Sequence, residues 1–149
     1  MLDTAPKHGR YTLRPIVEDD YDFLWNLKIV TLRGYIEEYF GWDDETSRSF
    51  LRRTMENGHL VLVDGQPAGI LKVYEEGGWL YLAEIGLMPE YQNKGLGTQM
   101  IQDVLDLADK LGINVELQVF ANNPARRLYE RMGFQTTHHK MYRPVGLRR

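Results

Sequence analysis

Apolar residues along this chain recur at two spacings, either every second residue or every third to fourth residue. The first spacing predicts a strand with one buried face, and the second predicts an amphipathic helix. On this basis the sequence predicts strands at 11–16, 59–63, 66–76, 79–88, 113–119 and 134–143, and helices at 17–36, 41–58, 95–111 and 123–133. The order β-α-α-β-β-β-α-β-α-β is typical of a mixed α/β sheet in one domain.

Turn and cap residues set several of these boundaries. Asp64-Gly65 and Gly77-Gly78 are favoured two-residue hairpin turns, so the strands on either side of each turn should be antiparallel neighbours. The second helix should be capped by Asp43 or Asp44, because a carboxylate there accepts amide hydrogens at the helix start. Gly34 is a candidate point of interruption in the first helix.

Composition and charge narrow the classes of function. The 149 residues suit one domain with its core at 11–142 and short tails, and 43% hydrophobic content is ordinary for a globular protein. A net charge of -3 without runs of one sign favours neither a nucleic-acid nor a membrane partner. The absence of cysteine excludes disulfides, thiolate metal sites and a thiol nucleophile. The N-terminus has no signal-like apolar core, so a cytoplasmic location is the default expectation.

Two glycines one residue apart, Gly95 and Gly97, stand where the third predicted helix begins. Backbone amides at a helix start lack partners within the helix and carry the positive end of its dipole. They attract an anion such as a phosphate wherever small side chains let it approach. Gln92, Lys94 and Thr98 would add donors. From this pattern alone, a tight turn without a ligand is the alternative.

The glycine pair departs from two known phosphate-binding motifs, because a dinucleotide fingerprint needs glycine in place of Met100 and a P-loop needs its lysine after the glycine. Together with a second block, however, it resembles the signature of the Gcn5-related N-acetyltransferase family. The first block reads Gln92-Asn93-Lys94-Gly95-Leu96-Gly97, and the second has Asn122, Ala125, Tyr129, Gly133 and Phe134 at the family's spacing. The order of elements over 11–142 fits as well.

This resemblance implies acetyl-coenzyme A as the co-substrate and no metal. In the family the glycine loop binds the pyrophosphate, while the end of the preceding strand pairs with the pantetheine arm and directs an amide at the thioester oxygen. The cofactor-binding residues implied here are Ile85, Gly86, Leu87, Gln92, Asn93, Lys94, Gly95, Leu96, Gly97, Thr98, Asn122, Ala125 and Tyr129. Splaying of strands 79–88 and 113–119 would place Leu87 and Val119 on opposite sides of the gap that admits the cofactor.

The resemblance also implies direct transfer of the acetyl group to a primary amine. Tyr129 matches the family's tyrosine near the thioester sulfur and would protonate the leaving thiolate, with simple packing on the sheet as the alternative. Some members carry a glutamate base on the fifth strand, where this chain has Gln118, which accepts no proton. Glu84 is the substitute, and burial would raise its pKa. A structural carboxylate or a water chain without a dedicated base are the alternatives.

Acceptor specificity in the family comes largely from the first two helices and the last hairpin. Residues 34–46 interleave four aromatic side chains with five carboxylates, which suits a cationic amine, whereas helix capping and core packing are the simpler account. His138-His139 is a further candidate contact to the acceptor or cofactor, but adjacent strand residues face opposite sides and do not predict a metal site.

Two rival functions stay open at this point. One is a non-catalytic acyl-CoA-binding sensor or scaffold, against which the presence of Tyr129 counts. The other is a transferase that uses a different acyl group, for example succinyl. The sequence does not identify the acceptor, which is a small-molecule or peptide amine, and the family implies a homodimer as one alternative for assembly.

Overall fold

The computed structural model describes residues 10–137 and 140–144. The chain divides into two compact units, Met1–Lys72 with Glu84–Lys94, and Val73–Ala83 with Gly95–Arg149. Strands β3 (Gln66–Glu76) and β4 (Trp79–Leu87) each contribute residues to both units. Among the helices of the described ranges, none has the length and apolar character needed to cross a membrane.

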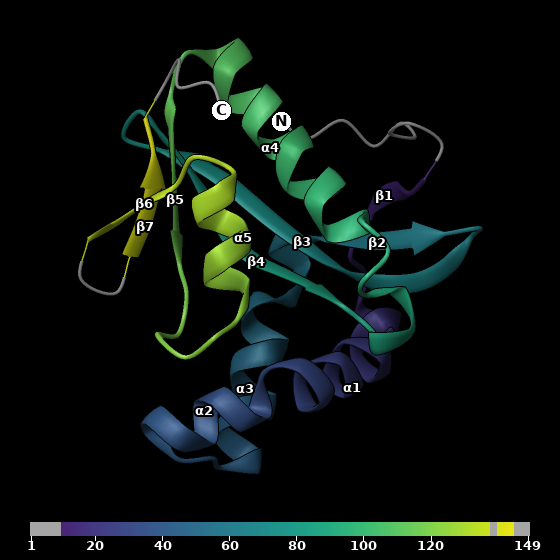
Figure 1. Ribbon diagram of the computed structural model, residues 1–149. Coiled ribbons are helices and arrows are strands. Elements are labelled where there is room, and N and C mark those ends of the chain that lie inside the picture. Colours follow the sequence, from purple (N-terminus) through teal and green to yellow (C-terminus); the bar gives the residue numbers. More distant parts are fainter. Residues whose placement is uncertain (1–9, 138–139, 145–149) are drawn as a thin grey trace. The chain divides into compact units, whose positions relative to one another are not determined.

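The described residues form a mixed α/β fold, as predicted (Figure 1). The remaining strands are β1 (Thr12–Pro15), β2 (His59–Val63), β5 (Asn114–Gln118), β6 (Gln135–Thr137) and β7 (Lys140–Arg143). The helices are α1 (Tyr21–Thr31), α2 (Arg33–Phe40), α3 (Asp44–Thr54), α4 (Leu96–Leu111) and α5 (Ala125–Arg131). The strand order is β1-β2-β3-β4-β5-β7-β6, in which β4 and β5 run parallel and β2 and β3 antiparallel.

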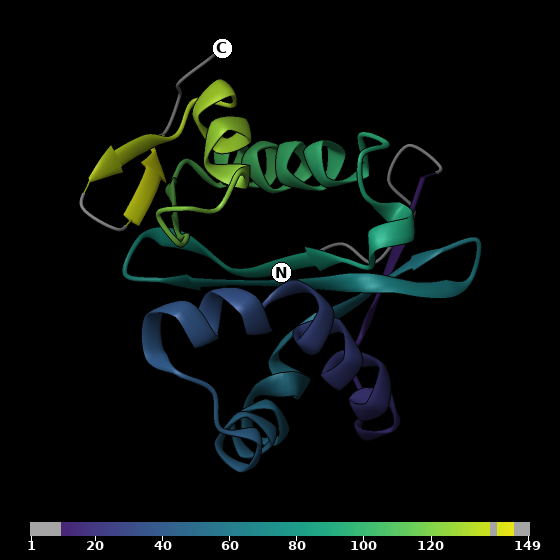
Figure 2. The same cartoon turned by 60° about the horizontal axis from the view of Figure 1, so that its bottom comes forward.

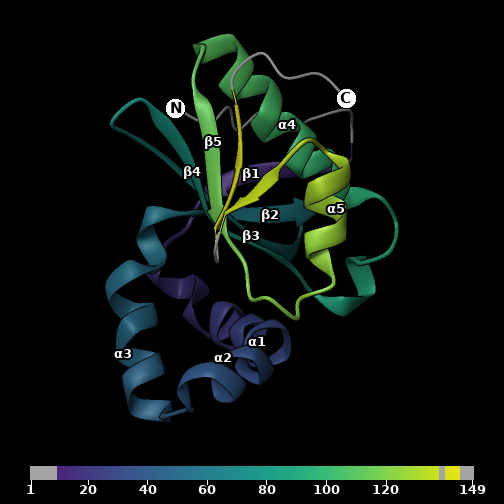
Figure 3. The same cartoon turned by 60° about the vertical axis from the view of Figure 1, so that its left-hand side comes forward.

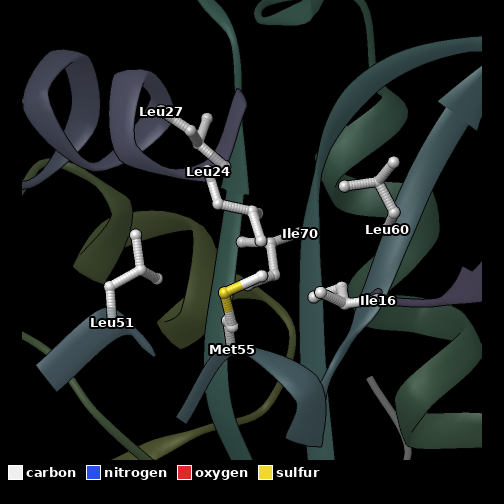
Figure 4. Packing of buried hydrophobic residues seen from close by; sticks show 7 residues of the cluster. All are labelled: Ile16, Leu24, Leu27, Leu51, Met55, Leu60 and Ile70. Carbon is white, nitrogen blue, oxygen red and sulfur yellow. The ribbon is translucent and has the colours of Figure 1, made fainter. Parts of the chain in front are cut away.

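An apolar core between two helices and two strands holds the first unit together. Its side chains come from α1, from α3 and the turn after it, from β2 and β3, and from the residue that follows β1: Ile16, Leu24, Leu27, Leu51, Met55, Leu60 and Ile70 (Figure 4). Leu24 and Leu27 lie three residues apart and therefore on one face of α1. Because burial of each such side chain contributes about 1.5–3 kcal/mol, this core fixes α1 and α3 on one face of β2 and β3 (Figure 2).

Strands β3 and β4 approach closely at a pair of glycines. A Cβ atom built on Gly69 would lie 2.0 Å from the carbonyl oxygen of Gly86, so only glycine fits at position 69. Just beyond β4, the Met88 amide donates a hydrogen bond of 2.8 Å to the Ala68 carbonyl. The backbone around Gly69 therefore fixes the position of the last residues of β4.

In the second unit, a buried arginine joins β7 to α4. Arg143 is 3% exposed and donates to the Asp109 carboxylate at 2.7 Å and to the Leu105 carbonyl at 3.2 Å. A buried guanidinium requires such acceptors, and the two contacts together fix β7 against this helix. Strand β7 also pairs with β5, so the β6–β7 hairpin lies beside β5 (Figure 3).

Turns and caps were predicted well. Positive φ angles at Asp64, Gly65, Gly77 and Gly78 (51°, 78°, 59° and 82°) are those of the expected two-residue hairpin turns. Asp43 caps α3, because its carboxylate accepts the amide hydrogen of the residue three positions later at 2.9 Å.

The prediction for the first helix was wrong in one respect. The region 17–36 contains two α-helices, and the break lies at Leu32, whereas Gly34 lies inside α2. The hydroxyl of Thr31 donates to the Leu27 carbonyl at 2.7 Å. This local bond, which competes for a helix carbonyl and bends helices, accounts for a break before the glycine.

The predicted last strand, 134–143, is a hairpin of two strands. Strands β6 and β7 pair antiparallel, with Thr136 opposite Met141. The residues between them, His138-His139, lie outside the described residues. The run Thr-Thr-His-His-Lys holds no glycine, proline, asparagine or aspartate, so no turn residue indicated the reversal.

The close approach of β3 and β4 generates a prediction. Gly69→Ala should lower the free energy of unfolding by at least about 2 kcal/mol, because its methyl group meets the carbonyl of Gly86. The matched control is Gly86→Ala, whose methyl group would make only ordinary contacts at 3.8 Å. Urea unfolding of both variants measures the difference, and equal losses of stability would contradict this account.

Candidate active site

The last residues of β4 carry the predicted base and the predicted partner of the pantetheine arm. Glu84, Ile85 and Gly86 are partly buried, and Leu87 is 7% exposed. Val119, just beyond β5, is partly buried. The gap expected between the side chains of Leu87 and Val119 stays a prediction.

Glu84 is a partly buried carboxylate on which the charges of two lysines act. No hydrogen bond or ion pair joins it to another residue in the part of the chain that the structure describes. Burial raises the pKa of the Glu84 carboxyl, and the ammonium groups of Lys72 and Lys28 lower it to a lesser extent. The choice between a base, a structural carboxylate and a water chain stays a prediction.

The loop after β4 is anchored at two points. The Gln92 side-chain amide donates to the Leu87 carbonyl at 2.8 Å, so one of its two N–H groups holds the loop to β4, and its expected role as a phosphate donor stays a prediction. The guanidinium of Arg10 donates to the Lys94 carbonyl at 2.6 Å. Sequence reasoning missed Arg10, because a contact across 84 residues of chain leaves no local pattern.

The glycine turn directs the backbone into α4. Asn93 and Gly95 both have positive φ, 61° and 80°, and Gly95 is the N-cap of the helix. The Gly95 carbonyl accepts the amide of Gln99, so the amides of Leu96, Gly97 and Thr98 have no acceptor within α4. No acidic residue lies in this first turn. The turn therefore presents the donors and the positive dipole end that an anion requires.

Tyr129 on α5 is 7% exposed, and its ring meets that of Phe134 edge to face at 5.7 Å between centroids. Burial raises the pKa of its phenol to about 12. Its hydroxyl has no hydrogen-bond partner among the described residues. The ring is thus packed, as one alternative expected, and the role of the hydroxyl as a proton donor stays a prediction.

The start of α5 is fixed by a residue that the sequence reasoning did not single out. The Asn123 side-chain oxygen accepts the amide hydrogen of Ala125 at 2.9 Å, and the preceding Asn122 is exposed. Such an asparagine turn is a common way to begin a helix. Gln118, at the end of β5, is exposed.

The aromatic and acidic stretch 34–46 is partly explained by contacts within the first unit. Arg33 lies over the Trp42 ring at 5.1 Å, and the indole of Trp42 donates to Asp44 at 2.6 Å. Phe40, by contrast, is 80% exposed. The simpler account therefore holds for Trp42 and for the cap residue Asp43, while a cationic acceptor at this surface stays a prediction.

Comparison with known proteins decides the family. A profile of the acetyltransferase (GNAT) family matches residues 14–134, which include β4, the glycine turn and α5. The chain belongs to this family. The resemblance found in the two sequence blocks is thereby confirmed.

Individual relatives of this GNAT chain are distant. An uncharacterised N-acetyltransferase of Methanocaldococcus jannaschii is 27% identical, and the match covers 84% of this chain and 61% of that protein. The PaiA N-acetyltransferase of Thermoplasma acidophilum, solved in complex with coenzyme A, has a TM-score of 0.67 at 18% identity and covers 91% and 99% of the two chains. The ribosomal-protein-S18-alanine N-acetyltransferase of Escherichia coli has a TM-score of 0.68 at 20% identity, and the match covers 93% of this chain and 96% of that chain.

Proposed function

We propose that this protein is an acetyl-CoA-dependent N-acetyltransferase that moves the acetyl group directly to a primary amine. The observation that carries the proposal is the glycine turn at the start of α4, where Asn93 and Gly95 adopt positive φ and free amides precede the first helical bond. Family membership supports the reaction class, and the coenzyme A bound by the Thermoplasma relative supports the co-substrate.

In this proposal the neutral amine attacks the thioester carbon, and the carbon–sulfur bond then breaks. Glu84, or a water chain to solvent without a dedicated base, takes the proton that the amine loses. The backbone at Ile85–Leu87 pairs with the pantetheine arm, and an amide there stabilises the oxyanion. The amides that begin α4 bind the pyrophosphate.

Tyr129 would donate to the departing sulfur, and its high pKa limits how it does so. A thiol has a pKa near 8.5, about 3.5 below the value of about 12 for this phenol, so complete transfer is uphill by roughly 5 kcal/mol. The phenol therefore acts first as a hydrogen-bond donor to the developing thiolate. The same high pKa keeps it protonated throughout the physiological range.

The proposal is tested by calorimetry with acetyl-, succinyl- and free coenzyme A, followed by assays of thiol release with a panel of amines. Binding of acetyl-CoA with thiol release on one class of amine is expected. Binding without turnover on any amine would favour the sensor or scaffold, and faster turnover with succinyl-CoA would favour the other acyl group. No binding of any coenzyme A compound would overturn the proposal.

Gly97→Val tests the phosphate site. The branched side chain would occupy the space in front of the helix amides, so the affinity for coenzyme A should fall by at least about 10²-fold, the loss of two charge-assisted hydrogen bonds. Gly34→Val is the matched control, since each glycine is the second residue of its helix and a Cβ at Gly34 has no neighbour within 4 Å. Calorimetry compares the two, and unchanged affinity in Gly97→Val would refute the site.

Tyr129→Phe tests the acid. It should lower kcat by roughly 10² with little change in the affinity for acetyl-CoA, because only the donor to the sulfur is lost. Tyr142→Phe is the control, since it removes a tyrosine hydroxyl whose bond to Gln135, at 3.1 Å, is exposed. Steady-state kinetics of both variants decide between catalysis and packing, and a Tyr129→Phe rate equal to the wild type would leave only packing.

Glu84→Gln tests the base. A base acts when deprotonated, so a raised pKa should place the acidic limb of the pH–rate profile above the usual glutamate range, with activity rising as pH rises through that pKa. The variant should lose this limb and most of the activity. Glu116→Gln, which alters an ion pair to Lys140 at 3.8 Å, should keep the limb. A Glu84→Gln profile of unchanged shape would assign the role to water.

A further inference from the structure

Helix α1 crosses β4 beside the predicted base. A Cβ atom built on Gly86 would lie 3.8 Å from the hydroxyl oxygen of Thr31. Lys28 lies one helical turn before Thr31, on the same face of α1. Glu84 lies two residues before Gly86, on the same face of β4. Lys28 and Glu84 therefore lie on the faces of α1 and β4 that meet. The charges of Lys28 and Glu84 act on each other, which agrees with this arrangement of α1 and β4. The facing pairs are therefore Lys28 with Glu84 and Thr31 with Gly86.

The Lys28 ammonium has no hydrogen-bond acceptor among the residues that the structure describes. Lys28 is partly buried, and its Nζ lies 5.0 Å from the centroid of the Phe50 ring. No hydrogen bond or ion pair of Lys28 occurs within the described ranges. Lys72, the other lysine near Glu84, differs in this respect because its Nζ donates to the Thr54 carbonyl at 3.0 Å. A partly buried ammonium without an acceptor is costly, and an anion would relieve that cost.

The local charge also favours an anion. Lys28 and Lys72 outweigh the single carboxylate of Glu84, and Arg53 adds a further positive charge at 5.8 Å from the Phe50 ring. The excess grows when the predicted base accepts a proton from the amine. A polycationic acceptor would be repelled at this position, whereas an acceptor with an acid group would be attracted.

Gly86 lies two residues after Glu84 and faces Thr31 of α1. Its φ is not positive, and an added Cβ would make only ordinary contacts, so neither backbone conformation nor packing requires glycine there. A Cβ atom there would meet Ile70 and Thr31 at 3.8 Å, so the glycine leaves room for a methyl group between β4 and α1. An acceptor that reaches Glu84 would pass within reach of Lys28.

We propose that Lys28 is a specificity-determining residue that binds a carboxylate on the acceptor, so that the substrate is an amine that also carries an acid, such as an amino acid. This inference rests on the proposed acetyl transfer and names the substrate class of that same site. It differs from the cationic acceptor that the acidic stretch 34–46 predicts. The amine is directed to Glu84 while the acid pairs with the Lys28 ammonium.

The test compares amines that differ only in the acid. Leucine, phenylalanine and lysine are each compared with the amine formed by their decarboxylation, at saturating acetyl-CoA and with thiol release as the readout. The acid-bearing member should have a kcat/KM at least about tenfold higher, the value of one charge-assisted hydrogen bond. Preference for the decarboxylated amines, including cadaverine over lysine, would overturn the inference while leaving the N-acetyltransferase assignment standing.

Variants of Lys28 separate recognition from structure. Lys28→Met should raise KM for the acid-bearing acceptors about tenfold, leave kcat within about twofold, and leave the decarboxylated amines unaffected. Lys28→Arg should retain most of the preference, and Lys110→Met, at an exposed lysine of α4, should behave as the wild type. Thermal unfolding verifies that each variant is folded. An unchanged KM in Lys28→Met would refute the role of Lys28.

A direct binding experiment keeps the two proposals distinguishable. The same amino acids are titrated by calorimetry into protein saturated with coenzyme A. Binding that Lys28→Met weakens supports the inference even where turnover is slow. If no amino acid binds and none is acetylated, the inference is wrong, whatever the result for acetyl-CoA. Absence of coenzyme A binding, by contrast, refutes the proposed function.

Discussion

The close approach of two backbones at Gly69 and Gly86 is the constraint on which the site in the first unit depends. Because no side chain separates these residues, the carbonyl of Gly86 and the chain beyond it are held against β3. The Met88–Ala68 hydrogen bond extends this contact to the end of β4. The Gln92 side chain then attaches the following loop to Leu87. The course of the chain after the predicted base is thus set by two backbone contacts and by the side chain of Gln92.

Burial raises the pKa of both candidate catalytic groups, with opposite consequences for the proposed chemistry. It raises the pKa of Glu84, which moves a carboxyl group toward the range where it can take a proton from an amine. It also raises the pKa of Tyr129, to about 12, which makes a weaker acid of the phenol. The same physical cause therefore improves the base and limits the acid. Burial thus suits Glu84 to the proposed role of base, and it suits Tyr129 to donating a hydrogen bond to the sulfur and not to complete proton transfer.

Local chemistry in the sequence predicted much of the fold. Asp64-Gly65 and Gly77-Gly78 specify turns through backbone conformation, and Asp43 specifies a cap through its carboxylate, so neither depends on distant residues. The break at Leu32 was missed because a hydroxyl one residue earlier decided it, while the nearby glycine was the stronger signal. Failures of this kind arise where a tertiary or side-chain contact overrides a local preference.

Sequence patterns likewise predicted some residues of the candidate site and missed others. The two motif blocks identified the glycine turn and α5, and the positive φ angles of Asn93 and Gly95 explain why the turn leaves a pattern in the sequence. Arg10 and Lys28 left no signal, since their relation to Lys94 and Glu84 exists only after folding. Gln92 was found by its motif, but its donor is directed to Leu87. A motif therefore locates a residue more dependably than it assigns the atom that the residue will contact.

The acidic stretch 34–46 and Lys28 favour acceptors of opposite charge. Which of them matters more depends on the charges that a substrate meets at close range. Exposed carboxylates on α2 and the loop after it act through water, where salt screens them beyond about 8 Å. Several of them also have partners. Glu37, for example, forms an ion pair with Arg33 at 3.1 Å. Lys28 is partly buried, so its field is less screened, and it has no acceptor among the residues described. In the proposed site, surface acids would therefore influence which molecules arrive, and Lys28 would have the larger influence on which molecule stays.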